Sequence, residues 1–600
     1  MRLPCVPSRA LKGLRTPLVF APIGQRRHSH TTTYDAAVIG GGITGLTAAY
    51  RLSQDPNCSK ITLYEKSPHL GGWLLSEKIP VEGGNVVFEY GPRTLRTAVP
   101  GCLPLLDLLL ELDLYDDVLL TSKSSPAARN RYIYYPDHLV RMPAPVPNAG
   151  LIANIRDPLY AMLHEPVFEG LLKSILLEPF RPLPGSKTIH SDESIADFVS
   201  RRFCPEVADN LVSALFHGIY AGNISRLSAQ TIMGTMRDLE NDSRRVLGGY
   251  VNSLMSGVKH MLMDDLLALE SVAHEKPGSY WKDLRTLVSG TSVLTLKEGL
   301  GQLSNALVDA LNKSKKVDVL ANTDVTSITQ NRNTHDLMVR SGQDRSRIHN
   351  RVIATIPAPD LAKTLATPTV TDQSLPQNTI SYLEEHNYAV TVMVVNLYYP
   401  NPDLLPVSGF GYLIPRSIPY EQNPEMALGV IFGSDSSVGQ DTAPGTKLTV
   451  MMGGHLWDGW KESEYPDHEA AVAMSRNLLH RHLGITDAPT VTRSRLQRNA
   501  IPQYTVGHLS RMHDLSRSAR RELNNRLTIA GSWYNGVGVT DCIRQAYLAA
   551  SYGVGARKLG PGDGDRPWRR FDYENWDLEG GIVTSPVRWA EVYKSERKHF

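Results

Sequence analysis

The sequence predicts a protein of the α/β class that also carries a large α-helical region. Residues 36–52 consist of an apolar stretch, a glycine-rich stretch and apolar residues at helical spacing. Residues 61–64 form a second short apolar run, and residues 386–456 contain segments that alternate apolar and polar side chains. A strand, turn and helix followed by another strand is typical of a doubly wound parallel sheet, whereas alternation is typical of antiparallel strands.

Composition is that of an ordinary globular protein with several domains. The chain has 600 residues, of which 42% are hydrophobic and 21% charged. A net charge of +2 gives no reason to expect a nucleic-acid partner. No apolar run approaches 18 residues, so no membrane-spanning helix is predicted, although peripheral attachment stays open. The five cysteines include no C-x-x-C pair, so we expect neither a metal site nor a disulfide framework.

Residues 1–33 have the composition of a targeting segment. The segment contains six arginines and lysines and frequent Ser and Thr, and no acidic residue precedes Asp35. An arginine-rich, acid-poor segment with short apolar stretches is typical of an organellar transit peptide, and the alternative is a basic tail without structure.

The glycine-rich stretch has the spacing of a dinucleotide-binding loop. Gly40, Gly42 and Gly45 fit G-x-G-x-x-G between a strand and a helix. In this motif the first glycine permits the tight turn, the second lets backbone approach a pyrophosphate, and the third lets the helix pack on the strand. Glu65 ends the second strand, 20 residues after Gly45, where a carboxylate accepts from a ribose hydroxyl. We therefore predict a Rossmann-like unit, the alternative being a turn that only packs.

Two further loops indicate which dinucleotide is bound. Residues 70–73 read Leu-Gly-Gly-Trp, and residues 88–93 read Phe-Glu-Tyr-Gly-Pro-Arg. After a Rossmann-like unit, this succession resembles the flavoproteins of the amine-oxidase type, whose corresponding loops cover the ADP and the flavin. The resemblance implies FAD rather than a diffusing nicotinamide. Arg93 is then either a cation beside the flavin or a residue that fixes its turn by a salt bridge.

The middle of the chain is mostly helical. Residues 103–114 are leucine-dense and predict a core helix, and residues 127–134 predict a short strand. Residues 151–183 are apolar at helical spacing, which fits either a helix lying in a membrane interface or an ordinary core helix. Residues 194–222 continue as helix, whereas 238–288 are more polar and are expected to be partly a surface insertion.

The chain is predicted to return to the cofactor domain twice. Residues 317–320 and 351–356 read as strands, the latter closed by Pro357. Residues 527–543 read as a strand, a glycine loop and a helix, with Asp541 as the expected N-cap. A helix N-terminus aimed at the flavin pyrimidine would stabilise the negative charge of reduced flavin.

Several motifs together resemble the oxygen-dependent mitochondrial protoporphyrinogen oxidases. Besides the loops above, they are Asn130-Arg131, Tyr220-Ala221-Gly222-Asn223, residues 407–415, Ala500-Ile501-Pro502-Gln503-Tyr504 and residues 536–543. They occur in order over about residues 35–555 and leave out the first segment, part of 238–288 and the tail. The resemblance implies a six-electron oxidation of protoporphyrinogen IX to protoporphyrin IX, in which FAD passes electrons to O2 and gives H2O2.

The resemblance also implies which residues form the site. Substrate-binding positions are Arg131, as the partner of a propionate, and Leu215, Gly411, Leu413, Ile431 and Met451, which line a flat apolar slot. Cofactor-binding positions are Gly40, Gly41, Gly42, Ile43, Thr44, Gly45, Glu65, Lys66, Trp73, Gly91, Pro92, Arg93, Thr94, Val325, Val537, Gly538 and Val539. No acid, base or metal ligand is predicted, and His217 is interpreted as structural.

The expected organisation is a discontinuous FAD-binding domain with an antiparallel-sheet substrate domain and a helical membrane-associated domain. The segments are 1–33 transit, 34–125 FAD-binding, 126–290 helical, 291–360 FAD-binding, 361–495 substrate sheet, 496–557 FAD-binding and 558–600 tail. By resemblance, the protein is a peripheral inner-membrane protein of mitochondria on the intermembrane-space side, a homodimer, with possible contact to ferrochelatase. The alternatives are an amine oxidase or carotenoid-type desaturase on the same fold, and a flavin-binding scaffold without activity.

Overall fold

The structure is a computed structural model. It describes residues 33–97, 101–144, 150–181, 191–243, 245–256, 258–273, 278–331, 333–342, 345–367, 375–554, 579–584 and 589–593. The predicted transit segment lies outside the described residues except for its last position, as does most of the tail predicted at 558–600.

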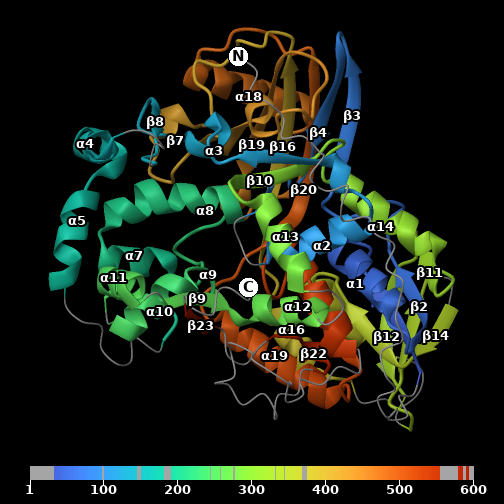
Figure 1. The fold of residues 1–600 in the computed structure, drawn as a ribbon. Coiled ribbons are helices and arrows are strands. Elements are labelled where there is room, and N and C mark those ends of the chain that lie inside the picture. The colour runs from blue at the N-terminus through green and yellow to red at the C-terminus, as the bar shows by residue number, and fades with distance from the viewer. Residues whose placement is uncertain are drawn as a thin grey trace.

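A six-stranded parallel sheet forms the centre of the largest domain (Figure 1). Its order is β11 (Val317–Leu320), β2 (Cys58–Tyr64), β1 (Tyr34–Ile39), β15 (Arg351–Ala354), β21 (Leu527–Ile529) and β22 (Gly581–Ile582). All neighbouring pairs are parallel. Three distant parts of the chain therefore build one Rossmann-like sheet, as predicted. The prediction had left the tail outside this sheet, and that was wrong, because β22 is its last strand.

Helices cover one face of this sheet, and helices together with a small sheet cover the other. One apolar core lies under α1 (Ile43–Gln54), α2 (Cys102–Glu111), α14 (Gly301–Lys313) and α20 (Val539–Leu548). The opposite core lies under α15 (Ala358–Ala366), α16 (Gln377–Glu385) and α19 (His508–Glu522), with the sheet of β12 (Val325–Gln330), β13 (Leu337–Ser341) and β14 (Arg345–His349). Parallel strands buried on both faces explain the near-continuous apolar runs in the sequence.

The second sheet has seven strands and is mixed. Its order is β20 (Val491–Pro502), β16 (Ala389–Tyr399), β19 (Thr446–Gly453), β18 (Ala427–Phe432), β17 (Gly411–Leu413), β7 (Arg131–Tyr134) and β8 (Leu139–Arg141). All pairs are antiparallel except β17 with β7. The expectation of a purely antiparallel sheet is corrected at this pair, because β7 enters from a distant segment. Strand β20 runs through the boundary predicted at 495/496.

The region after β8 is helical and lies to one side of the two sheets (Figure 1). It contains α4 (Leu151–His164), η4 (Pro166–Phe168), α5 (Leu171–Leu177), η5 (Glu178–Phe180), α7 (Ile195–Arg202), the π-helix η6 (Val207–Val212), α8 (Ser213–Tyr220), α9 (Ala229–Ile232), α10 (Gly234–Ser243) and α11 (Val246–Ser256). An apolar core formed largely by α7, η6 and α8 holds it together.

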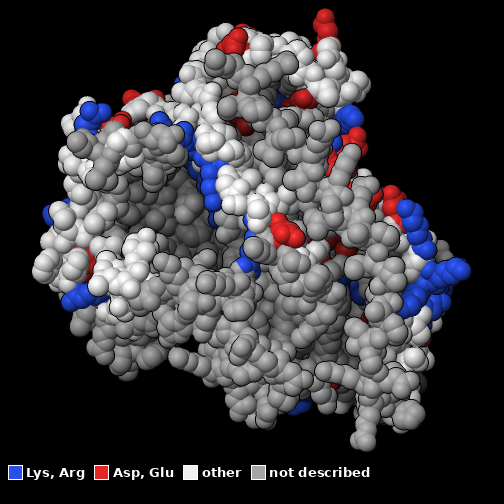
Figure 2. Space-filling view, in the orientation of Figure 1, with Lys and Arg blue, Asp and Glu red and all other residues white. Residues whose placement is uncertain are grey.

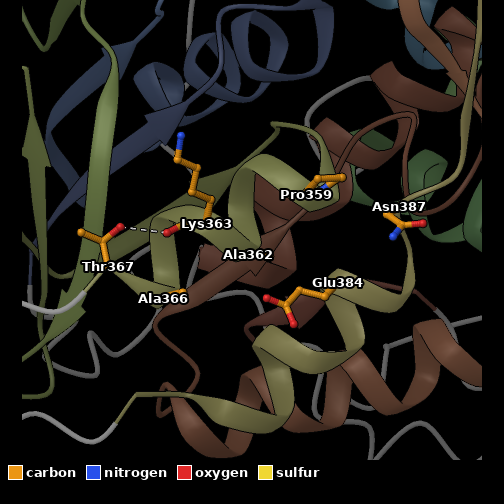
Figure 3. Close-up of a pocket in the computed structure, with 7 residues that line it drawn as sticks. All are labelled: Pro359, Ala362, Lys363, Ala366, Thr367, Glu384 and Asn387. Carbon is orange, nitrogen blue, oxygen red and sulfur yellow. Dashed lines mark hydrogen bonds between the residues drawn. The ribbon is translucent and has the colours of Figure 1, made fainter. Parts of the chain in front are cut away.

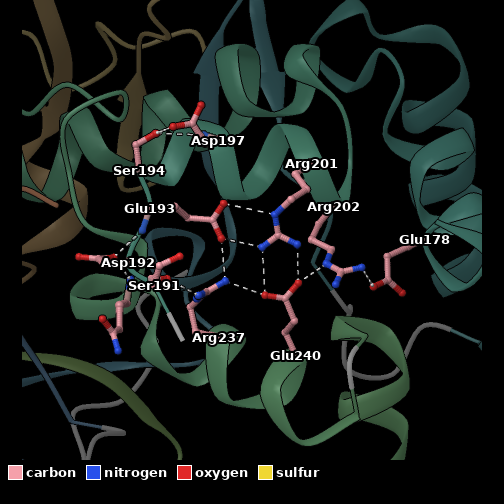
Figure 4. Close-up of polar contacts among 11 residues, drawn as sticks. Glu178, Ser191, Asp192, Glu193, Ser194, Asp197, Arg201, Arg202, Arg237 and Glu240 are labelled. Carbon is pink, nitrogen blue, oxygen red and sulfur yellow. Dashed lines mark hydrogen bonds and ion pairs between the residues drawn. The ribbon is translucent and has the colours of Figure 1, made fainter. Parts of the chain in front are cut away.

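A buried ion network also joins these helices (Figure 4). Arg201, Arg202 and Arg237 point toward Glu240, which is fully buried. Glu193 accepts from Arg201 and Arg237 at 2.6 and 2.7 Å, and Glu178 of η5 lies beside Arg202. Removing one partner from such a network leaves an uncompensated buried charge, which typically costs several kcal/mol. The network therefore fixes the positions of η5, α7 and α10 relative to one another.

Three details differ from the sequence predictions. Residues 126–129 form a short helix, α3 (Pro126–Arg129), so the predicted strand begins only at Arg131. Residues 238–288 are not simply a surface insertion, because α12 (Met263–Ala273) is buried against α20 and α2, with Leu266 and Leu267 each 1% exposed. Asp541 is the third residue of α20 rather than its N-cap, which is Gly538.

The remaining elements connect the domains. They are β3 (Ser76–Val81), β4 (Gly84–Glu89), β5 (Leu95–Arg96), η3 (Tyr115–Asp117), β6 (Val118–Ser122), β9 (Val258–Leu262), α13 (Gly278–Val288), β10 (Thr291–Leu296), η7 (Tyr420–Gln422), α17 (Gly433–Ser436), η8 (Gly454–Trp457), η9 (Glu462–Glu464), α18 (His468–Leu483), the π-helix η10 (Ala549–Val554) and β23 (Trp589–Tyr593). Strand β23 pairs antiparallel with β9, so a second piece of the tail also has a place in the fold.

Candidate flavin and substrate site

The turn between β1 and α1 has the geometry of a phosphate-binding loop. Gly40 has a φ of +105°, in the region that favours glycine. A Cβ on Gly45 would lie 1.9 Å from the carbonyl oxygen of Gly40, so helix and strand pack at a distance only glycine permits. A Cβ on Gly42 would meet no atom within 4 Å, so this position faces open space. The first turn of α1 has no side-chain cap, which leaves its N–H groups for an anion.

Glu65 lies beside this loop at the carboxyl end of β2. Its carboxylate accepts from the N–H of Gly41 at 2.7 Å and from the N–H of Ser67 at 2.8 Å. Each oxygen retains acceptor capacity for a ribose hydroxyl. The next residue, Lys66, forms an exposed ion pair with Asp360 at 3.1 Å. The N–H of Thr323 donates to the carbonyl of Glu65 at 2.7 Å, so Val325, two residues after Thr323, lies near Glu65.

The loop at 70–73 crosses directly over the glycine loop. The N–H of Gly71 donates to the carbonyl of Gly41 at 2.8 Å, and Gly71 forms a bridge with Gly42. The Gly-Pro-Arg loop packs on it in turn, since a Cβ on Gly91 would lie 2.2 Å from the carbonyl oxygen of Trp73. Two loops predicted to contact the cofactor are therefore stacked over the phosphate loop, and Pro92 and Thr94 are half-buried beside Gly91.

Arg93 is buried without an ionic partner. Only 9% of the residue is exposed, and among the described residues its guanidinium makes no hydrogen bond or ion pair. Burial lowers its pKa to about 10, against the opposing effect of Glu89. The salt bridge that would have fixed the turn is thus absent from the described part of the chain. Buried cations normally have an acceptor, so Arg93 is a candidate contact of the cofactor.

Glu89 is the carboxyl group that acts on Arg93 electrostatically, and sequence reasoning missed it. It is 5% exposed and accepts from Ser76 Oγ at 2.6 Å and from the N–H of Leu300 at 2.7 Å. Burial raises its pKa to about 7. In the sequence, Glu89 is only a single acidic residue at the end of an apolar strand. Such a residue can be recognised as buried only once the fold is known.

The amino end of α20 completes the cofactor side. Val537 and Gly538 are half-buried, and Val539 is 6% exposed. The Asp541 carboxylate accepts from the N–H of Gly538 at 3.2 Å, which fixes the first turn. The thiol of Cys542 is hydrogen-bonded to Thr44 of α1, so the amino ends of α1 and α20 lie together. Burial raises the pKa of Cys542 to about 12, and the thiol stays protonated.

The predicted slot residues share one face of the mixed sheet. Gly411 lies opposite Ile431, and Met451 lies opposite Gly429, which in turn pairs with Leu413. Gly411 is buried, whereas Leu413, Ile431 and Met451 are only half-buried. The residues between them point to the other face, where Tyr412, Val430 and Val450 form a core. The half-open face is the one that carries the four predicted residues.

Helix α8 lies over this face. Leu215 is 47% exposed, and a Cβ on Gly218 would lie 2.8 Å from the Leu413 side chain. Gly411 itself has a φ of +136°, and a Cβ there would meet the carbonyl oxygen of Val430 at 2.1 Å. Its own backbone therefore demands glycine, independently of any ligand.

Arg131 is at the edge of the same face, opposite Gly411 in the parallel pair. Its guanidinium lies 5.7 Å from the centroid of the Phe410 ring, and among the described residues it forms no ion pair. Partial burial lowers its pKa, and the nearby Arg96 adds to this effect. A line of Lys and Arg runs across the face drawn in Figure 2, close to where α3 lies in Figure 1. This edge is suited to an anionic group.

Polar residues on the sheet face connect the slot to the flavin side. Asn396 donates to the carbonyl of Glu89 at 3.0 Å, and Gln497 donates to the carbonyl of Tyr90 at 2.8 Å. Thr449 donates to Asn396 at 2.6 Å. Sequence reasoning did not single out these residues, although Asn396 is an isolated polar residue in an apolar strand. They place the slot against the loop that carries Arg93.

A surface pocket of about 550 Å³ lies elsewhere, between α15 and α16 (Figure 3). Its lining residues are Pro359, Ala362, Lys363, Ala366, Thr367, Glu384 and Asn387. None of them is a predicted site residue, and the only carboxylate and ammonium group come from different helices. His217 is also outside the slot, because its ring nitrogens contact the Ile414 carbonyl at 2.7 Å and His455 at 2.8 Å.

Within the described ranges, no cluster of three or more His, Cys, Asp or Glu is arranged to hold a metal ion. A search of the same ranges found no helix with the length and apolar character needed to cross a membrane.

Comparison with known proteins supports the assignment suggested by this geometry. The model of the flavin-containing amine oxidoreductases matches residues 43–552. A solved structure from Exiguobacterium sp. 255-15 superposes with a TM-score of 0.63 at 20% identity, covering 86% of this chain and 98% of that one. Cyclohexylamine oxidase from Brevibacterium oxydans IH-35A gives 0.55 at 16% identity, over 86% and 98%. These two structures show a shared fold, and the chain belongs to the flavin-containing amine oxidoreductase family.

Sequence relatives show which group within this family the chain belongs to. Protoporphyrinogen oxidase of Schizosaccharomyces pombe is 35% identical over 86% of this chain and 97% of its own length. The Homo sapiens protoporphyrinogen oxidase is 32% identical over 86% and 97%. Within its family the chain is thus a member of the protoporphyrinogen oxidases, FAD flavoproteins of haem biosynthesis.

Proposed function

We propose that the slot between α8 and the mixed sheet binds protoporphyrinogen IX and presents it to FAD held by the Rossmann-like domain. The observation that supports this most directly is the half-open sheet face, which has Arg131 at one edge and the Arg93 loop at the other. A flat macrocycle with anionic propionates needs an apolar surface and a cation at its rim. Both are present on one sheet.

The residues fit FAD at three points. Open space at Gly42 beside the amino end of α1 accommodates a pyrophosphate, and Glu65 is placed for the ribose. The amino end of α20 and Arg93, which has no ion pair among the described residues, would lie beside the flavin ring. Bound FAD would supply the two-electron redox chemistry, namely uptake of a hydride from a methylene bridge and transfer of two electrons to O2 with formation of H2O2, in each of three rounds.

The protein's own contribution is binding, orientation and exclusion of water. Arg131 would hold a propionate by a bidentate contact. Leu215, Leu413, Ile431 and Met451 would contact the macrocycle faces, which fixes the bridge that reacts. Among the described slot residues none is a carboxylate or histidine placed as a base, so no residue is assigned as the proton acceptor. Arg93 would stabilise charge on the flavin side.

Two assays test this function. Purified protein given protoporphyrinogen under air should produce porphyrin fluorescence and peroxide together, much faster than spontaneous oxidation. A rate equal to the spontaneous one would refute the assignment. An amine-oxidase activity is the second candidate because the fold is shared, and it is tested by peroxide release from primary and secondary amines. Peroxide release from amines but not from protoporphyrinogen would favour it.

A peripheral membrane site is proposed on the helical region. Large apolar side chains are exposed there on α4, α5, η5 and α11: Ile155, Leu159, Leu163, Leu176, Leu177, Phe180, Tyr250, Val251, Leu254 and Met255, with Phe180 and Met255 each 83% exposed. Exposed apolar surface of this extent marks an interaction site. We call these ten residues the apolar face. An apolar substrate and an amphipathic surface both favour the membrane interface as its partner.

The location and assembly are proposed from the relatives. The arginine-rich segment 1–33 would direct the chain to mitochondria, and the apolar face would attach it to the inner membrane on the intermembrane-space side. A homodimer and a contact with ferrochelatase complete the proposal. A fluorescent fusion with and without residues 1–33 tests the address, and light scattering of the purified protein tests the dimer. Cytosolic signal from the full chain would contradict the address.

A further inference from the structure

The loop that leads into α20 is held by residues far from it in sequence. It begins after β21 at Ala530 and ends at Gly538, the N-cap of α20. It contains Asn535, whose side chain and carbonyl both form hydrogen bonds. Because Val537, Gly538 and Val539 follow at once, the position of Asn535 sets the position of the helix start.

The side chain of Asn535 is bonded to α12. Its Nδ2 donates to Asp264 Oδ2 at 2.8 Å, and Asp264 is only 4% exposed. The same carboxylate oxygen accepts from the hydroxyl of Thr584 at 2.8 Å. Asp264 therefore joins the loop to the C-terminal segment, which lies outside the motifs that define the family resemblance.

The parallel sheet explains how Thr584 reaches this point. Strand β22 pairs in parallel with β21, with Thr528 opposite Gly581 and Ile529 opposite Ile582. Both strands therefore run to the same carboxyl edge, which is where ligands bind in open α/β sheets. Ser516 of α19 anchors β22 by contacts of 3.0 and 3.2 Å to the N–H and carbonyl of Ile582.

The carbonyl of Asn535 is bonded to α20 itself. Arg544 and Gln545 each donate to it at 3.0 Å. Arg544 also donates to Asp265, the residue after Asp264 in α12, at 2.9 Å. Asp264 therefore binds the side chain of Asn535 directly, and Asp265 binds the arginine that contacts the carbonyl of Asn535. The N–H of Gly536 donates to the Tyr504 hydroxyl at 2.7 Å. Together these hydrogen bonds fix the conformation of the loop.

We propose that Asp264 and Thr584 are positioning residues for the flavin, and that the segment 579–584 supports the cofactor site from behind. This rests on the proposal that residues 537–539 face the flavin. Asp264 and Thr584 do not touch the cofactor in this scheme. They act through Asn535, because a shift of the loop moves the amino end of α20 and the partial positive charge that favours reduced flavin.

The experiment swaps the two residues of the hydrogen bond between Asn535 and Asp264 in the full-length holoenzyme. Asp264→Asn replaces the charged acceptor of this bond with the weaker oxygen of a neutral amide. Asn535→Asp places two carboxylates against each other. The double variant Asp264→Asn with Asn535→Asp restores a donor and an acceptor with the direction reversed. Thr584→Val removes the second contact, and Thr584→Ser keeps its hydroxyl. Readouts are the FAD dissociation constant from flavin fluorescence, the flavin midpoint potential and the visible circular dichroism.

Each single variant at 264 or 535 should weaken FAD binding about tenfold and lower the midpoint potential, since the lost bond involves a charged group. The double variant should recover to within about threefold. Thr584→Val should shift the potential in the same direction, and Thr584→Ser should not. If Asp264→Asn fails to fold, the Thr584 pair still decides the question. Unchanged potential in Thr584→Val, or no recovery in the double variant, overturns the proposal.

Gly538→Val tests the proposal that residues 537–539 face the flavin separately from the positioning role of Asp264 and Thr584. If Gly538→Val leaves the dissociation constant and the dichroism unchanged, residues 537–539 do not face the flavin, and the placement fails. If Gly538→Val abolishes binding while the exchanges at 264 and 535 have no effect, the placement stands and the positioning role is refuted.

Discussion

The amide of Asn396 donates to the main-chain carbonyl of Glu89 at 3.0 Å and thereby fastens the substrate-side sheet to the loop of the flavin-side domain. Four residues after Glu89 comes Arg93, buried and without an ionic partner in the described ranges. A fold normally supplies a buried guanidinium with acceptors. We propose that the acceptor for Arg93 comes with the cofactor.

Replacing Arg93 with Met should therefore weaken FAD binding without destabilising the apoprotein. Met fills similar volume and removes a charge that is costly to bury. We expect the FAD dissociation constant to rise at least tenfold while the thermal midpoint of the apoprotein stays equal or increases. Fluorescence titration and thermal melting of apoprotein give the two values. A lower apoprotein midpoint with unchanged FAD affinity would instead make Arg93 a structural residue of its turn.

Gly42→Val and Gly45→Val should separate cofactor loss from misfolding. A side chain at 42 meets open space, so the apoprotein should fold while the pyrophosphate position is filled and flavin is lost. At 45 the first added carbon would lie 1.9 Å from the Gly40 carbonyl oxygen, so this variant should not fold. Flavin absorbance and far-ultraviolet circular dichroism distinguish the two. Full flavin occupancy in Gly42→Val would refute the phosphate-loop assignment.

Arg131→Ala should raise KM more than it lowers kcat. The proposed propionate contact would be the same in the ground state and the transition state, so its loss should weaken binding rather than slow the chemical step. We expect KM to rise about tenfold and kcat to change less than threefold. Arg141→Ala is the matched control, because Arg141 lies on the neighbouring strand β8 and is exposed. Equal KM values for the two variants would remove the propionate role.

The sequence predicted local backbone turns better than contacts between distant segments. Glycine spacing reports local backbone requirements, so Gly40, Gly45 and the turn of β1 into α1 were predicted correctly. Asp264 and Thr584 could not be predicted, because their meeting depends on β22 joining a sheet whose other strands lie at least 50 residues earlier. The mixed sheet was predicted as antiparallel for the same reason, since the pairing of β17 with β7 spans a gap of about 280 residues.

Glu89 should make stability depend on pH between about 4.5 and 7. Burial raises its pKa to about 7, so the folded state keeps a proton that the unfolded chain releases near pH 4.5. The stabilising contribution of the protonated form is present below pH 4.5 and is lost as pH rises to 7. The thermal midpoint of Glu89→Gln should therefore exceed that of the wild type by an amount that grows from pH 5 to pH 7.5. Parallel curves for the two proteins would contradict the raised pKa.

Phe180→Glu should release the protein from membranes without altering its fold. Phe180 is 83% exposed, so a charge there costs little in the free protein, but it opposes insertion of the apolar face into the acyl boundary. The matched control is Val438→Glu, a substitution at a residue that is 70% exposed, follows α17 and does not belong to the apolar face. Co-sedimentation with vesicles of mixed phosphatidylcholine and cardiolipin should fall at least fivefold for Phe180→Glu and stay unchanged for Val438→Glu. Thermal midpoints of both variants should match the wild type. Equal sedimentation of both variants would mean that the apolar face contacts a protein partner or nothing, and the membrane assignment would be withdrawn.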